Sequence, residues 1–195
     1  MTTTAKDIEK CSDDFIFLSK DHNSSYDDLN IFGSVVKYII AVFKCKTFYS
    51  DKCVISNDIF KDILPTHLEG YAEGIIKKVF KNLSDMGFKI VFYDYLNSFE
   101  MSSDDKSNHN DIVDCIVDCI IYNAECKAKL GLSCFFFNEL YIKTITPEFN
   151  DGVDFRMEVF SKLDNLGFKV DYLTHNKFCY LLDWKKYRTQ KYLKY

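Results

Sequence analysis

The chain has few glycines and prolines, and it has no long apolar run. Its 195 residues include 7 glycines and 2 prolines, which excludes collagen-like and linker-like chains. The most apolar stretch, 112–122, is interrupted by Asp114 and Asp118 and is shorter than the roughly 18 residues that a membrane helix needs. The first ten residues, MTTTAKDIEK, contain no apolar segment. We therefore expect no secretory signal and no membrane partner.

Sequence motifs of common enzymes are also missing. None of G-x-x-x-x-G-K-[ST], G-x-G-x-x-G, H-E-x-x-H or G-x-S-x-G occurs. The four histidines are scattered, without a fixed spacing to a cysteine or serine. We therefore expect a protein that is not an enzyme and that needs no cofactor.

Eight cysteines are present without a regular spacing, so we expect reduced thiols rather than a disulfide framework. Cys115, Cys119 and Cys126 fall on one helix face near His109, which makes a metal site the alternative. However, 11 residues of straight helix span about 16 Å, too far for one ion. Isoleucines also alternate with these thiols, as on a core face, so we expect no metal.

The composition supplies ample material for a core, with 47% hydrophobic and 16% aromatic residues. Lysine outnumbers arginine 23 to 2, and Asn, Ile, Phe and Tyr are abundant. This bias resembles that of proteins from AT-rich genomes, such as those of large DNA viruses, some phages, amoebae and a few bacteria. It indicates an origin and says nothing about the fold.

Three segments recur in the same order along the chain, which indicates an internal duplication. Their offsets are 81, 82 and 80 residues, and they pair 34–46 with 114–127, 54–65 with 136–147, and 79–90 with 159–170. The sequence therefore predicts an N-terminal extension at 1–30, a first repeat at 31–101, a polar linker at 102–111, a second repeat at 112–184 and a basic tail at 185–195. Within the extension, 15–18 is expected to be a strand or a docking segment.

Each repeat is expected to contain a helix, a short strand, a short helix, a long helix and a hairpin, in that order. Gly87 and Gly167 are placed to end the long helices, because glycine readily adopts positive φ. The expected positions are first helices from about 35 and 112, strands at 53–55 and 134–137, short helices at 57–63 and 138–145, long helices at 67–86 and 148–166, and hairpins at 88–101 and 168–184.

This order, together with L-x-x-x-G-F-x-[IV] at 83–90 and 163–170, resembles the winged-helix family. In that family the pattern closes the third helix and opens the wing. The fold class expected is α+β, with two tandem winged-helix-like repeats; another small α+β unit is the alternative. Twelve residues are expected in the core: Ile39, Ile40, Val79, Phe80, Leu83, Phe88, Ile120, Ile121, Val159, Phe160, Leu163 and Phe168.

The resemblance implies DNA binding, because winged-helix domains often lay the third helix in the major groove. It would make Lys77, Lys78 and Lys81 the DNA contacts. The fronts of both long helices are acidic, however, and these carboxylates would face phosphates. The acids are Glu69, Glu73, Glu148, Asp151, Asp154 and Glu158. Groove binding by both repeats is therefore disfavoured.

The C-terminal tail is the better candidate for nucleic acid. The chain has a net charge of −4, but 185–195 carries +5, so the remainder sums to −9. Its tyrosines are suited to stacking on bases, although a solvated extension that touches the acidic body is the simpler interpretation. The candidate contacts for nucleic acid or a partner are Lys185, Lys186, Tyr187, Arg188, Lys191, Tyr192 and Lys194.

By elimination, the sequence favours an intracellular protein-interaction or structural protein, a scaffold or adaptor, in the host cytoplasm or a virion if the gene is viral. Its partners would be proteins, including a second copy of itself. The alternative is a tandem winged-helix DNA-binding protein that acts in transcription or genome handling. The repeats differ at surface-type positions, with Lys37 against Asp118 and Lys44 against Glu125, which we interpret as two unlike partner faces.

Overall fold

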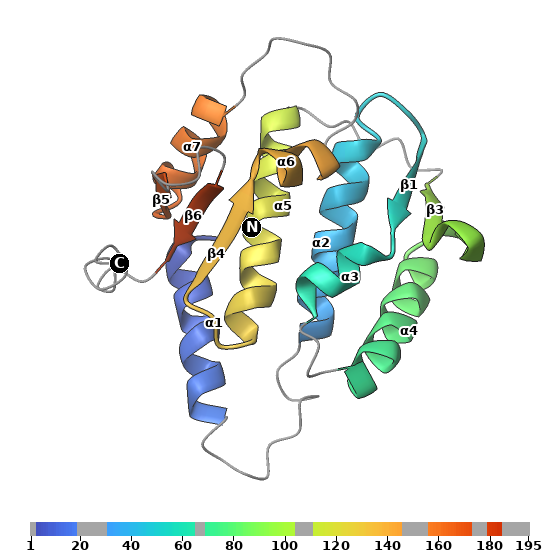
Figure 1. Cartoon of the computed structure of the whole chain (residues 1–195), viewed down its shortest axis with the longest axis horizontal. Helices are drawn as coiled ribbons and strands as arrows, with labels where there is room; N and C mark the ends of the chain where they lie inside the picture. The colour runs from blue at the N-terminus through green and yellow to red at the C-terminus, as the bar shows by residue number, and fades with distance from the viewer. Residues whose placement is uncertain are drawn as a thin grey trace.

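The computed structural model describes residues 3–18, 31–64, 69–103, 111–145, 156–172 and 179–184. Within them the fold is α+β, with helices packed around two small antiparallel sheets (Figure 1). The helices are α1 Ala5–Leu18, α2 Ile31–Lys46, α3 Asp58–Ile63, α4 Glu69–Asp85, the 3₁₀ turn η3 Asp94–Leu96, α5 Ile112–Lys129, α6 Glu139–Ile145 and α7 Arg156–Asn165. The strands are β1 Lys52–Ser56, β2 Lys89–Tyr93, β3 Ser98–Ser102, β4 Cys134–Asn138, β5 Lys169–Tyr172 and β6 Cys179–Asp183.

The elements expected from sequence periodicity are confirmed where the structure describes them. The first half runs α2, β1, α3, α4, β2, β3, and the second runs α5, β4, α6, α7, β5, β6. The sheet order is β1-β3-β2 in the first half and β4-β6-β5 in the second. The front of the second long helix, expected from 148, lies outside the described residues up to 155.

The long helices of both halves end in the same way. Gly87 and Gly167 have φ of +93° and +86°, a conformation in which a side chain would be strained. The next residue then turns back, so that Phe88 N donates to Leu83 O at 3.1 Å and Phe168 N donates to Leu163 O at 3.0 Å. Each long helix is therefore followed directly by a strand of its own sheet.

Aromatic rings join the third helix to the middle strand in both halves. The ring centroids of Phe80 on α4 and Phe99 on β3 are 5.0 Å apart, and those of Phe160 on α7 and Tyr180 on β6 are 4.9 Å apart. Phe99 and Tyr180 are buried on the middle strand of each sheet, where the rings of the third helix cover them. These rings fix each sheet onto its helices.

The expected core is confirmed at eight of the twelve positions. Ile40, Phe80, Phe88 and Phe160 are instead half-buried and pack against the core from its margin. Helical spacing identifies the inward face of a helix but not how deeply each side chain enters. The buried residues of both halves belong to one cluster.

Residues 15–18, expected to be a strand or a docking segment, belong to helix α1, so the strand alternative is wrong. Ala5, Ile8 and Cys11 recur at three-residue spacing, and the first two are buried. Ala5 N donates to Leu166 O at 3.0 Å, which ties the start of α1 to the end of α7. Asp7 accepts from Thr4 N at 2.8 Å and from Thr4 Oγ1 at 2.7 Å, which caps the helix start. The helix docks against the second half of the chain (Figure 1).

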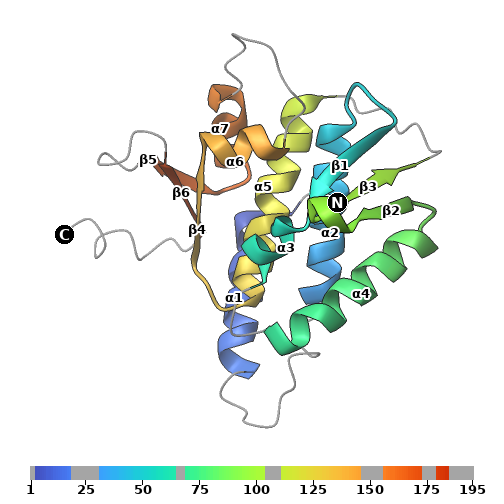
Figure 2. The same cartoon turned by 45° about the vertical axis from the view of Figure 1, so that its right-hand side comes forward.

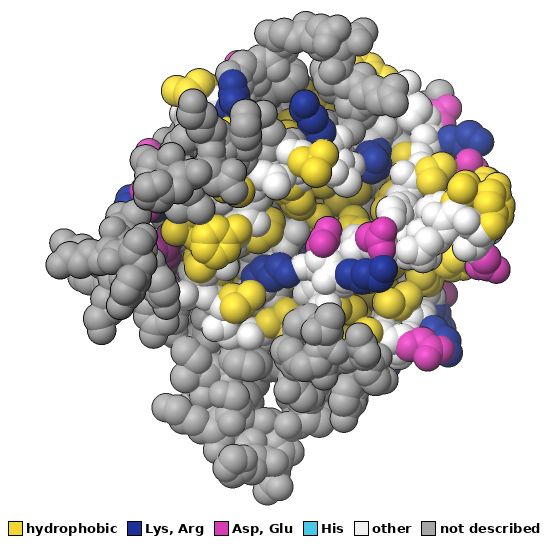
Figure 3. All heavy atoms as spheres, in the orientation of Figure 1, with side chains coloured by type: hydrophobic (Ala, Val, Ile, Leu, Met, Phe, Trp, Pro, Cys, Tyr) yellow, Lys and Arg dark blue, Asp and Glu magenta, His cyan; other side chains and the backbone are white. Residues whose placement is uncertain are grey.

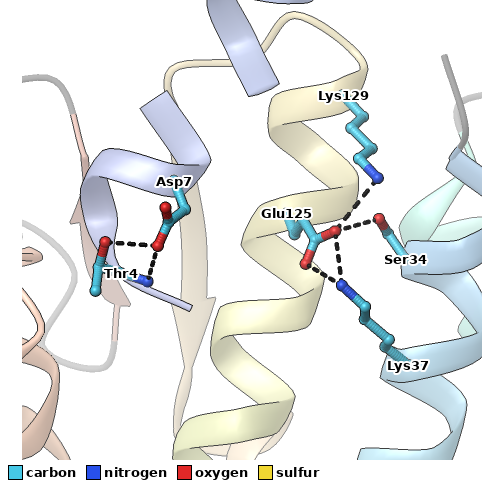
Figure 4. A network of polar contacts seen from close by, with 6 residues as sticks. All are labelled: Thr4, Asp7, Ser34, Lys37, Glu125 and Lys129. Atoms are coloured by element: carbon cyan, nitrogen blue, oxygen red, sulfur yellow. Dashed lines mark hydrogen bonds and ion pairs between the residues drawn. The ribbon is translucent and has the colours of Figure 1, made fainter. Parts of the chain in front are cut away.

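Helices α2 and α5 lie side by side in the middle of the molecule, with one half of the chain on either side (Figures 1 and 2). Glu125 is buried between them and accepts from Ser34 Oγ at 2.6 Å (Figure 4). Lys37 and Lys129 each lie 3.3 Å from the same carboxylate. Burial alone would raise the pKa of Glu125, but the Ser34 hydrogen bond and the lysine charges outweigh it and lower this pKa.

This arrangement corrects the interpretation of the differing surface-type residues as outward partner faces. Lys37 of α2 pairs with the buried Glu125 of α5, so it contacts the other half of the same chain. Lys44 also interacts electrostatically with Asp118. Burial raises the pKa of Asp118, and the positive charge of Lys44 opposes this rise. The differences make the two central helices complementary to each other. Helical periodicity alone did not show which faces would meet.

Candidate functional site

A recess of about 550 Å³ opens between the two halves, along strand β4. All five residues of β4 line it, with Leu140, Tyr141 and Thr144 of α6 on one side. Asn123 and Lys127 of α5, Asp62 of α3 and Leu132 complete the lining. We call this recess the β4 groove. Hydrophobic side chains gather around it on the face shown in Figure 3.

The apolar lining results from the alternation of side chains along β4. Phe135 and Phe137 point inward and are buried, whereas Phe136 points outward and is 59% exposed. Leu132 and Leu140, which flank the strand, are 48% and 69% exposed. Three large apolar side chains therefore stand at the solvent-facing rim of one recess.

A polar group lies at the floor of the groove. The Asn123 side chain is 1% exposed, and its Nδ2 donates to Tyr141 Oη at 3.3 Å. Tyr141 Oη in turn lies 3.4 Å from Cys119 O, to which it donates. No hydrogen-bond partner for Asn123 Oδ1 is found among the described residues. A buried carbonyl oxygen without a donor is unfavourable, so this oxygen is a polar weak point beneath the apolar lining.

The charged groups of the groove belong to one contact between the halves. Lys127 Nζ donates to the backbone oxygen of Asp62, which joins α5 to α3. Burial lowers the pKa of Lys127. Burial also raises the pKa of Asp62, and the charge of Lys127 opposes that rise. One cation and one carboxylate are present, so these charges favour neither an anionic nor a cationic ligand over the other.

The lysines expected from the winged-helix resemblance lie elsewhere. Lys77, Lys78 and Lys81 are exposed on α4, on the side of the molecule away from β4 (Figure 1). Lys77 is 2.6 Å from Glu73 in an ion pair one helical turn apart. The tail candidates, Lys185, Lys186, Tyr187, Arg188, Lys191, Tyr192 and Lys194, lie outside the described residues.

A lysine on the long helix of the second half is ion-paired with carboxylates of the same chain. Lys162 of α7 lies 2.7 Å from both Asp111 and Asp114 at the start of α5. These hydrogen bonds raise the pKa of Lys162. Asp111 also caps α5 by accepting from Val113 N at 2.9 Å. Lys162 therefore holds α7 to α5.

None of the eight cysteines, all of which lie in the described ranges, forms a disulfide. Cys115 and Cys119 of α5 meet Cys45 of α2, a proximity that their sequence separation did not predict. The hydrogen bond with Cys45, together with burial, raises the pKa of Cys115. Burial likewise raises the pKa of Cys53 to about 12. Such thiols stay protonated near neutral pH and are poor nucleophiles. In the described part of the chain, no group of three or more His, Cys, Asp or Glu residues is arranged to hold a metal ion.

Sequence reasoning missed the β4 groove. Its residues come from α3, α5, β4 and α6, and they meet only through the packing of the two halves. One local signal was present: Phe135, Phe136 and Phe137 form an aromatic run of which one face must point outward if the run is a strand. A second was Asn123, a polar residue within the apolar face of α5.

Comparisons with known proteins leave the chain's own geometry as the basis for a functional proposal. A scan against protein-family models finds no match, and searches of curated proteins and of solved structures find no similar protein. Among the helices in the described ranges, none has the length and apolar character to cross a bilayer.

Proposed function

We propose that this chain is a non-enzymatic protein-interaction protein, a scaffold or adaptor made of two winged-helix-like halves that arose by duplication. The same order of elements in both halves supports the duplication, as does the same order of strands in both sheets. Within each unit the sheet order places the last strand in the middle, as a winged-helix wing requires. The equivalent ring contacts Phe80–Phe99 and Phe160–Tyr180 also support it.

The contacts between α2 and α5 support an origin from two identical units. Adding 81 to Lys37 and Lys44 gives Asp118 and Glu125. The ion pair of Lys37 with Glu125 is therefore the twofold counterpart of the charge interaction between Lys44 and Asp118. In an isologous dimer interface, residue i of one copy contacts residue j of the other, and residue j of the first copy contacts residue i of the second. The two interactions between α2 and α5 follow this pattern. We propose that duplication placed such an interface inside one chain, where its charges then diverged to complement each other.

The observation that carries the interaction role is that most of the exposed large apolar side chains among the described residues form two unlike groups. The first group lies on β2 and the following turn, where Val91, Phe92, Tyr95 and Leu96 are 50%, 52%, 83% and 57% exposed. The second group, Leu132, Phe136 and Leu140, rims the β4 groove. Exposed apolar groups of this kind are typical of protein-binding surfaces. Two different groups suit a protein that joins two partners.

The charges on the third helices favour this role over DNA binding. On α4, the exposed Lys77, Lys78 and Lys81 are accompanied by the exposed acids Glu73 and Asp85. Lys77 is ion-paired with Glu73. On α7, Glu158 and Asp164 are exposed while Lys162 is held by Asp111 and Asp114. A helix that enters the major groove needs cations facing phosphates. The free cysteines and lysine-rich composition support an intracellular setting, in host cytoplasm or a virion if the gene is viral.

Titrating duplex DNA with the full-length protein and with a chain lacking 185–195 separates the two functions. We expect the tail to carry whatever DNA binding occurs, so the truncated chain should keep its fold and lose that binding. Its five cations neutralise at most about five phosphates, so the slope of log affinity against log salt should not exceed about 4.5 in magnitude. Two salt concentrations suffice for the measurement.

The DNA-binding alternative predicts a different result for the same titration. Tight, sequence-dependent binding that survives truncation, and that falls when Lys77, Lys78 and Lys81 are replaced by glutamate, would overturn the proposed function. Circular dichroism and thermal unfolding of each variant check that the fold is unchanged.

A further inference from the structure

Strand β4 is an edge strand without the usual protection against pairing. Within the described residues its ladder is formed with β6 alone, and all five of its residues line the β4 groove. Proteins commonly place charges or prolines in edge strands to prevent accidental pairing with another chain. The sequence of β4 is Cys-Phe-Phe-Phe-Asn, which contains neither.

The other three edge strands all carry a charge. Lys52 in β1 is ion-paired with Glu100 at 3.1 Å, and Lys169 in β5 is ion-paired with Asp171 at 2.8 Å. Strand β2 begins with Lys89. The contrast with β1 is the sharpest, because β1 occupies the same place in the first half. Of the four edges, only that of β4 combines an uncharged strand with an adjoining recess among the described residues.

We propose that the β4 groove binds an extended, uncharged peptide segment of a partner protein, which adds to the sheet as a strand beside β4. This inference rests on the proposed interaction role and names the chemistry of one partner. Backbone N–H and C=O groups of the segment would pair with those of β4, which supplies affinity without a particular sequence. Alternate side chains of the segment would enter the recess, which supplies specificity.

The groove's side chains specify what such a segment must carry. Leu132, Phe136 and Leu140 at the rim favour an apolar side chain between them. Lys127 and Asp62 are of opposite charge and in contact through the Asp62 backbone, so they neither attract nor repel a neutral segment. A charged residue at the centre of the segment would lose its hydration without gaining a partner.

The test uses a phage-displayed library of random twelve-residue peptides and the full-length protein. We expect selected peptides to share an uncharged stretch with apolar residues at alternate positions. For a synthetic peptide of that sequence, Phe136→Asp should weaken binding about tenfold or more, as loss of a buried anchor does. Phe136 is exposed in the free protein, so this variant should fold normally.

The matched control is Val54→Asp. Val54 occupies the equivalent place in β1, 82 residues earlier, and is 48% exposed. This variant should bind the peptide as the wild type does. Two peptides methylated at the backbone nitrogens of alternate residues should behave differently. The peptide methylated at the residues that pair with β4 should not bind, and the peptide methylated at the intervening residues should bind normally, because only one edge of a strand pairs.

Three outcomes would overturn the proposal. One is the absence of any selected peptide. Another is a peptide that binds Phe136→Asp as well as the wild type but loses affinity for Leu96→Asp; the interaction role would then stand, with its site on the first half. The third is a concentration-dependent dimer that Phe136→Asp dissociates, which would assign the β4 edge to a second copy of this chain.

Discussion

Replacing Phe99 by alanine is expected to lower the free energy of unfolding by about 3–5 kcal/mol. Phe99 is fully buried on the middle strand of the first sheet. Its ring centroid lies 5.0 Å from that of Phe80, 6.3 Å from that of Phe60 and 6.4 Å from that of Phe92. Alanine leaves a cavity among three rings that belong to different elements. Urea unfolding followed by circular dichroism measures the loss.

Phe92→Ala is the control within the same ring cluster. Phe92 is 52% exposed on the edge strand β2, so its removal should cost no more than about 1 kcal/mol. Phe80→Ala should fall between the two, because Phe80 is half-buried. Equal losses for Phe99 and Phe92 would show that the first sheet does not pack as described.

Glu125→Ala is expected to cost about 2–3 kcal/mol, because it removes a buried charge on which Ser34, Lys37 and Lys129 converge. Breaking a fully buried pair costs about 3–5 kcal/mol. The expected value is smaller here because the Lys37 side chain is 51% exposed and is partly solvated after the change. The matched control is Glu73→Ala, which breaks an exposed ion pair of the same one-turn spacing with Lys77. This control should leave the unfolding midpoint unchanged.

The pH dependence tests the same network. Because the pKa of Glu125 is lower in the folded protein than its ordinary 4.5, the ionised carboxylate contributes stability above that value. This contribution is lost as the pH falls through the folded pKa. The difference in stability between wild type and Glu125→Gln should therefore be constant near neutral pH and shrink below 4.5. A difference that stays constant into the acid range would mean that the carboxylate is not held by its lysines.

Local features of this fold were predictable because they depend on neighbours in sequence. Gly87 and Gly167 marked the ends of two helices, since only glycine enters positive φ without strain. The strands at 53–55 and 134–137 followed from β-branched and aromatic residues in short runs. In the N-terminal segment, the short apolar run at 15–18 is also compatible with a strand, whereas the three-residue spacing that begins at Ala5 indicates the helix.

Features that depend on how the halves meet were not predictable in this way. Lys37 and Glu125 are 88 residues apart, and each is also compatible with an exposed helix face. Only the packing of α2 on α5 makes them partners. The β4 groove depends on the same packing, because Asp62 comes from one half and Asn123 from the other. The aromatic residues of β4 could be read from the sequence. The sequence does not show that this uncharged strand lies at the edge of its sheet, because that depends on the strand order.

The most direct test of the interaction role is a pulldown with tagged full-length protein from the cells that make it, with and without nuclease. The bait is compared with a variant in which Lys77, Lys78 and Lys81 are glutamates and with Phe136→Asp. Captured proteins are identified by mass spectrometry. We expect one or more proteins to be retained at the same level after nuclease treatment and by the lysine variant, and one of them to be lost with Phe136→Asp. Capture that disappears with nuclease, and with the lysine variant, would contradict a protein-interaction role and favour DNA binding.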